Sequence, residues 1–185
     1  MDLQKSLKQA WDILLLKDVA MQAVAKDSSA LPVSLGIFAG ATVLSKLGTL
    51  LIPYSTGMIV YRPSFVDFLV SSVLGIGVGI AMLFLTGLLA ERLFHSKLST
   101  EATVRVLGHA SLITALGFYQ PLNIISGIWY LVVLCTVLTR LGKLQPGSIL
   151  LLIILDLLLS GVLVGIWFEM MGPSFGSVHQ AGFVL

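Results

Sequence analysis

The chain has 185 residues, of which 57% are hydrophobic and only 11% are charged. Soluble domains carry about 25% charged residues, so this composition does not suit a fold whose whole surface faces water. The net charge of +2 is small, and no basic run indicates binding to nucleic acid. The composition therefore predicts an integral membrane protein of one domain.

Residues 1–30 are predicted to form a cytoplasmic amphipathic segment. Apolar side chains recur at helical spacing on one face, whereas Lys5 and Lys8 point elsewhere. The apolar face contains Leu3, Leu7, Ala10, Trp11, Leu14, Met21 and Ala25. Such a helix lies in the headgroup region with its lysines toward anionic lipid, but packing on the protein's own loops remains open. Lys17 and Asp18 interrupt the face and predict a bend.

Five later stretches are apolar enough to cross a bilayer, which takes about 20 residues. They cover about residues 31–53, 65–90, 104–119, 122–138 and 149–168. The third is the shortest and most polar, and a tight link around Pro121 predicts that it pairs with the fourth as a hairpin. We expect an all-α bundle of five transmembrane helices over residues 31–169, followed by a short extracytoplasmic tail over 170–185, because backbone polar groups must be paired in hydrocarbon.

The lysine and arginine residues of the loops alternate between the two sides of this topology. From the N-terminal segment to the tail, the six segments carry four, one, three, none, two and none, so nine of ten lie on one side. By the positive-inside rule that side is cytoplasmic. The prediction is a multi-pass protein with a cytoplasmic N-terminus and an extracytoplasmic C-terminus, in a prokaryotic inner or plasma membrane.

Four polar residues inside the predicted spans form a candidate intramembrane polar site: Lys46, His109, Ser111 and Asp156. A charge near the bilayer centre is costly and usually finds a partner or a wet cavity. Lys46 and Asp156 are offset in depth by about 9 Å, which a lysine stem can largely bridge. A structural ion pair, or Lys46 reaching outward to the interface, is the alternative. His109 more often bonds a neighbouring helix than performs catalysis.

Glycines recur at four-residue spacing in three spans, at Gly36 and Gly40, at Gly75 and Gly79, and at Gly161 and Gly165. This spacing lets helix backbones approach closely. Packing within the bundle is the favoured interpretation, and a homo-oligomer through these faces is the alternative. The three histidines share no metal-ligand spacing and Cys135 stands alone, so we expect no metal site, no cofactor and no catalytic residue.

A charged cytoplasmic loop joins the second and third spans. Ser99 or Thr100, followed by Glu101, predicts a helix start there. Together with the N-terminal helix, this loop is the predicted surface for lipid or for a cytoplasmic protein. The candidate residues of this surface are Lys5, Lys8, Trp11, Arg92, Lys97 and Arg105.

Two segments of the chain resemble the Yip domain family of Rab-interacting membrane proteins. "KQAWDILLLKD" is similar to the family's first amphipathic helix, and "LLAERLFHSKLSTEATVRVLGHASLITALG" is similar to its passage from the second to the third span. Gly108, Ala110 and Ser111 match the family's hydrophobic "vlGyas" run, while His109 stands where tyrosine is common. The resemblance implies five spans, a cytoplasmic N-terminus and no enzymatic motif. It implies a prokaryotic-type member, because the long N-terminal extension and "DLYGP"-like motif of eukaryotic relatives are absent.

Three functions follow from these patterns. The leading hypothesis is a non-enzymatic membrane organiser or adaptor that works through its cytoplasmic face. The alternative is a small transporter, channel or lipid scramblase that uses Lys46, Asp156 and His109, although few polar residues are available for a hydrophilic path. An intramembrane hydrolase is the third, and the sequence offers no convincing constellation for it.

Overall fold

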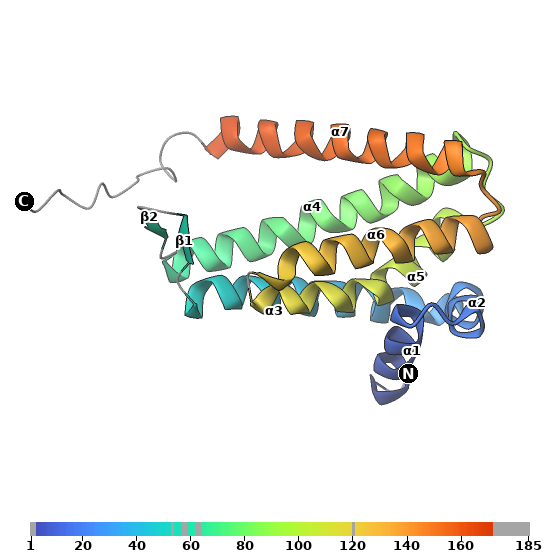
Figure 1. Ribbon diagram of the computed structural model, residues 1–185, viewed down its shortest axis with the longest axis horizontal. Coiled ribbons are helices and arrows are strands. Elements are labelled where there is room, and N and C mark those ends of the chain that lie inside the picture. The colour runs from blue at the N-terminus through green and yellow to red at the C-terminus, as the bar shows by residue number, and fades with distance from the viewer. Residues whose placement is uncertain (1–2, 53, 57–58, 62–63, 120, 172–185) are drawn as a thin grey trace, which may run out of the picture.

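The computed structural model describes residues 3–52, 54–56, 59–61, 64–119 and 121–171. In chain order its elements are α1 (Leu3–Leu14), α2 (Asp18–Lys26), the 3₁₀ helix η1 (Ser28–Ala30), α3 (Leu31–Leu51), β1 (Tyr54–Thr56), β2 (Ile59–Tyr61), α4 (Phe65–Arg92), α5 (Thr100–Ala110), the 3₁₀ helix η2 (Ser111–Phe118), α6 (Leu122–Arg140) and α7 (Pro146–Met171). The long helices lie side by side along one axis, with α1 and α2 toward one end (Figure 1). The predicted helical fold is confirmed, and one short antiparallel hairpin, β1–β2, is added to it.

Within the part of the chain that the structure describes, four helices are long and apolar enough to cross a membrane. They are Ser28–Leu51, Phe65–Arg92, Leu122–Arg140 and Pro146–Leu163, which correspond to the first, second, fourth and fifth predicted spans. Of the predicted tail over 170–185, residues 172–185 lie outside the described residues. The structure therefore supports a multi-pass membrane protein with at least these four candidate spans.

The third predicted span is divided into α5, with 11 residues, and η2, with eight. Hydroxyl groups bond backbone carbonyls at the junction: Ser111 Oγ donates to the Gly108 carbonyl at 2.6 Å, and Thr114 Oγ1 donates to the Ser111 carbonyl at 2.7 Å. Such bonds compete with the helical ladder and often bend helices. Neither piece alone is long enough to cross a bilayer.

The start of α5 lies where the sequence predicts it. Ser99 is the N-cap, and its Oγ accepts a hydrogen bond from the Ala102 amide at 3.3 Å. The Glu91 carboxylate at the end of α4 accepts bonds from both the amide and the hydroxyl of Thr100. The turn between α4 and α5 is therefore fixed by side chains from both helices.

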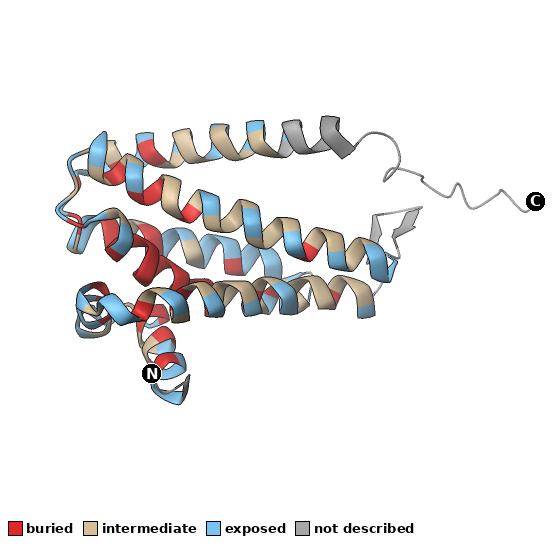
Figure 2. Ribbon diagram, turned by 180° about the vertical axis from the view of Figure 1, so that it is seen from behind, coloured by how far each residue is buried: buried red, intermediate tan, exposed pale blue. Residues whose placement is uncertain are grey.

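The buried residues concentrate on α5, which shows as a nearly continuous red segment in Figure 2. Every residue from 102 to 111 is buried, because α5 contacts α1, α2, α3, α4 and α6. By contrast, α7 lies at the edge of the bundle beside α4 and exposes Leu150, Leu157 and Leu158. Exposed leucines are the expected surface of a helix that faces lipid.

Small residues bring α3 into close contact with α5 and η2. An added Cβ at Gly108 would lie 2.8 Å from Ser34 Cβ, and one at Gly48 would overlap the backbone of Phe118. Gly75 and Gly79 pack within the bundle too, since an added Cβ would contact Thr42 or Phe38 of α3. This placement favours the packing interpretation for these glycines of α4.

Gly36 and Gly40 behave differently. Both are exposed, and an added Cβ at either position meets no atom within 4 Å. No neighbouring helix therefore packs closely on these two glycines of α3 in the described part of the bundle.

Candidate functional site

The helices α1 and α2 form a pair that docks on one end of the bundle. The predicted bend between them is confirmed: α1 ends at Leu14, α2 begins at Asp18, and Leu16 takes a left-handed conformation with φ of 58°. Lys17 pairs with Asp12 across the bend at 2.7 Å. The bend lets both helices contact α5.

Three side chains of the bundle hold backbone carbonyls of this pair. Trp129 Nε1 donates to the carbonyl of Leu14, the last residue of α1, at 3.0 Å. Arg105 Nη2 donates to the Ala25 carbonyl, in the last turn of α2, at 2.8 Å. The last carbonyls of a helix have no intrahelical partner, so these donors cap both helices while they fix them to the bundle.

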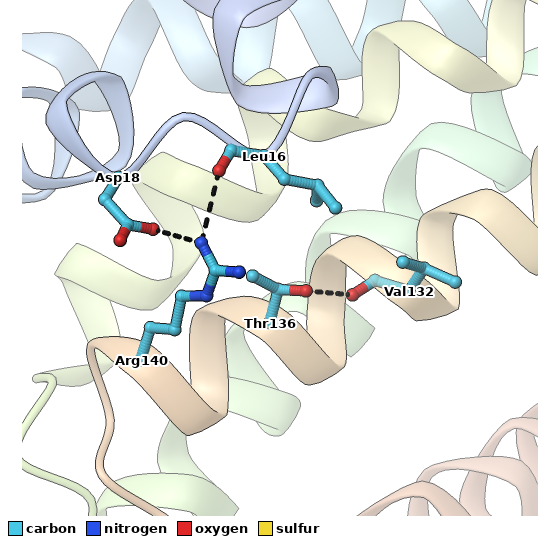
Figure 3. Close-up of polar contacts among 5 residues, drawn as sticks. All are labelled: Leu16, Asp18, Val132, Thr136 and Arg140. Carbon is cyan, nitrogen blue, oxygen red and sulfur yellow. Dashed lines mark hydrogen bonds and ion pairs between the residues drawn. The ribbon is translucent and has the colours of Figure 1, made fainter.

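Arg140 of α6 provides the third contact, at the bend (Figure 3). Its Nη1 lies 2.7 Å from Asp18 Oδ1 and 3.4 Å from the Leu16 carbonyl. Both side chains of the ion pair are about half exposed, so we expect it to contribute little to stability, about 0–1 kcal/mol.

The loops at this end are bonded to each other. The Lys97 amide, in the α4–α5 loop, donates to the Gly142 carbonyl, in the α6–α7 loop, at 2.9 Å. Most of the described cations gather here: Lys5, Lys8, Lys17, Lys26, Arg92, Lys97, Arg105, Arg140 and Lys143. We call this end, formed by α1, α2 and the two loops, the basic platform.

The prediction that Arg105 belongs to the exposed surface is wrong. Arg105 is only 7% exposed, because it lies on the face of α5 that α2 covers and its guanidinium bonds the Ala25 carbonyl. Arg92 and Lys97 are exposed, as predicted. Sequence position alone placed Arg105 near a loop and could not reveal that the N-terminal helices pack over it.

The faces of α1 also differ from the prediction. Ala10 and Leu14 are buried, but Trp11 is 59% exposed and Leu7 is 41% exposed. The predicted single apolar face is therefore divided into one sector that packs on the bundle and one that faces outward. Lys5 and Lys8 are exposed, as predicted.

His109 belongs to a buried network that joins α3 to α5. Ser34 Oγ lies 2.8 Å from His109 Nδ1, 2.8 Å from the Ala30 carbonyl and 2.9 Å from the Arg105 carbonyl. With the proton on Nδ1, the ring donates to Ser34 Oγ and Ser34 donates to the Ala30 carbonyl, while the Arg105 carbonyl lies 2.9 Å from both Nδ1 and Oγ. Nε2 is buried and has no hydrogen-bond partner among the described residues. Ser34 and His109 are fully buried, so the network serves helix packing. Sequence reasoning missed Ser34.

Lys46 and Asp156 are not brought together. Thr86 of α4 donates to Asp156 Oδ2 at 2.8 Å, while the Lys46 stem lies beside Gly75. Lys46 makes no ion pair within the described residues. Ser111 bonds the Gly108 carbonyl. The four candidate residues therefore do not form one polar site, and the described residues hold no group of three metal-ligating side chains.

We expect Asp156→Leu to leave the bundle folded, with a loss of no more than about 1–2 kcal/mol, because hydrogen bonds between membrane helices rarely contribute more. Thermal unfolding in mild detergent measures the loss. Asp156→Asn is the matched control, since it keeps an acceptor for Thr86. A larger loss in both variants would show that Asp156 does more than bond Thr86.

Comparison with protein-family models, curated proteins and solved structures gives no match for this chain. The functional interpretation therefore depends on the geometry of the basic platform and of the bundle.

Proposed function

We propose that this protein is a non-enzymatic membrane organiser or adaptor that acts through the basic platform. The observation that carries the proposal is the docked pair α1–α2, which exposes Trp11, Lys5 and Lys8. Arg105 and Trp129 of the bundle donate hydrogen bonds to its carbonyls. An exposed ring beside exposed lysines suits the headgroup region of an anionic leaflet. The platform is the cytoplasmic side in this proposal, by the positive-inside rule.

The proposal includes five spans, with α5 and η2 as the third. A 3₁₀ helix rises about 2.0 Å per residue against about 1.5 Å for an α-helix. The 11 residues of α5 and eight of η2 therefore reach about 32 Å, close to the hydrocarbon thickness of about 30 Å. In this arrangement the α4–α5 and α6–α7 loops are both cytoplasmic, and they lie at the same end of the bundle as α2 (Figure 1).

A five-span bundle with an interfacial N-terminal helix is also the layout of the Yip domain family, and we propose a prokaryotic-type relationship on that layout. We propose that the platform binds the anionic lipids of the cytoplasmic leaflet. A cytoplasmic protein that docks on the same platform is its second proposed partner. The transporter alternative loses its main support, because Asp156 accepts a hydrogen bond from Thr86 and the Lys46 stem lies beside Gly75, so the two residues do not form one site.

Lipid clustering tests the proposal. In vesicles that contain the full-length protein and a self-quenching phosphatidylglycerol, we expect quenching to rise with wild-type protein. The double variant Lys5→Gln/Lys8→Gln should weaken the effect about tenfold or more, since each lysine near an anionic surface contributes about 1 kcal/mol. Lys46→Gln removes a cation from outside the platform and should change nothing. Equal clustering in all three proteins would contradict the proposal.

A further inference from the structure

An open groove lies on the side of the bundle where α1, α3 and η2 meet. Its volume is about 510 Å³, and its walls are Leu7 of α1, the α3 residues between Val33 and Leu44, and Leu112 and Ala115 of η2. All nine lining residues are apolar or glycine. Gly36 and Gly40 form its floor without a side chain, because an added Cβ at either would meet only open space.

We infer that this groove binds one acyl chain of an anionic phospholipid, with its phosphate at Lys8. The inference rests on the proposed placement of α1 in the headgroup region. The walls come from a candidate membrane span, so the solvent at the open side of the groove is lipid. An apolar hollow in that position is filled by a hydrocarbon chain, which loses no hydrogen bond on entering it.

The length of the groove matches one leaflet. From Val33 to Leu44, α3 rises about 16 Å, which is half of a hydrocarbon core of about 30 Å. A second copy of the protein would instead follow α3 along the whole span, as glycines at four-residue spacing often permit. Leu7 shows that α1 stands at the groove, in the path of such a helix. The geometry therefore favours a lipid chain over a second copy.

Charge complementarity identifies the headgroup as anionic. Lys8 follows Leu7 directly in α1 and is exposed, and it makes no ion pair among the described residues. It lies one turn before Trp11, which is also exposed, so both side chains lie on the outward side of α1. The lysine stem can cover apolar surface while its ammonium group contacts phosphate.

Photolabelling of the full-length protein in vesicles tests the inference. The probes are phosphatidylglycerol and phosphatidylcholine with a diazirine in the acyl chain, and mass spectrometry locates the adducts. We expect labelling of α3 near Gly36 and Gly40 that is stronger with phosphatidylglycerol. Lys8→Gln should reduce this preference about fivefold, as expected for one lysine near an anionic lipid, whereas Lys143→Gln should not.

Gly36→Leu/Gly40→Leu fills the groove and should abolish the labelling. Gly77→Leu/Gly161→Leu is the matched control, because both glycines are exposed and open but lie outside the groove. Equal labelling of the two double variants would overturn the inference. The inference would also be overturned if the wild-type protein formed a dimer that only Gly36→Leu/Gly40→Leu loses, while lipid labelling of that variant stayed unchanged. If photolabelling of the groove persists but the wild-type protein does not cluster phosphatidylglycerol, the proposed function is rejected and the lipid-binding groove is still supported.

Discussion

Replacing Gly48 with alanine is expected to destabilise the protein by about 1–3 kcal/mol, the usual cost of overpacking. Gly48 is buried on α3, and an added Cβ would overlap the carbonyl oxygen, carbonyl carbon and Cα of Phe118 in η2. These are backbone atoms, so no side-chain rotation relieves the overlap. The added methyl group therefore forces η2 away from α3, and the close contact between these two elements is lost.

Thermal unfolding in mild detergent, followed by circular dichroism, measures this loss. Gly36→Ala is the matched control in the same helix, because its added methyl group meets no atom within 4 Å. Alanine favours a helix over glycine, so the control should be as stable as the wild-type protein or slightly more stable. If Gly48→Ala matched that control, the close contact between α3 and η2 would be absent from the folded protein.

The second large effect is expected for Arg105→Met, which should release α2 from the bundle. The substitution leaves the buried Ala25 carbonyl without its donor, and an unpaired buried acceptor costs about 1–3 kcal/mol. Methionine keeps much of the side-chain volume, so the lost hydrogen bond dominates. Hydrogen exchange of the amides in residues 18–26 should become faster, while the amides of α4 and α6 keep their protection.

Arg140→Met is the matched comparison, since it removes the other arginine that contacts the pair α1–α2. The Arg140–Asp18 ion pair is half exposed and should contribute only about 0–1 kcal/mol. We therefore expect a clearly larger loss of stability for Arg105→Met than for Arg140→Met. An equal or larger effect of Arg140→Met would mean that the contact at the bend, and not the contact at the end of α2, fixes the pair α1–α2 to the bundle.

Hydropathy predicted most of this fold, because a membrane span leaves a long and almost charge-free record in the sequence. The four spans that the structure supports by length and apolarity are the four most apolar stretches. The third stretch is the most polar of the five, because it contains His109, Ser111 and Thr114. The structure shows why these polar residues are present: Ser111 and Thr114 bond backbone carbonyls at the junction of α5 with η2, and His109 bonds Ser34.

Side-chain partners could not be predicted from the sequence. Arg105 was expected at the surface because it follows a loop, yet α2 covers it. The predicted depths of Lys46 and Asp156 left open whether the two residues meet, because depth does not fix which helix faces point at each other. Asp156 faces Thr86 on α4, a residue that no sequence pattern singled out. Helical periodicity likewise grouped Trp11 with Ala10, although only Ala10 packs on the bundle.

The depth of α1 relative to the bilayer decides whether the basic platform lies in the headgroup region, and site-directed spin labelling measures that depth. The two single-cysteine variants are Trp11→Cys and Lys5→Cys, each with Cys135→Ala, and each carries one spin label. Collision rates then show whether oxygen from the lipid phase or a nickel chelate from water reaches the label. If α1 lies in the headgroup region, the label at position 11 should collide mainly with oxygen and the label at position 5 mainly with the chelate. Equal access of the chelate to both labels would place α1 in water and contradict a platform in the headgroup region.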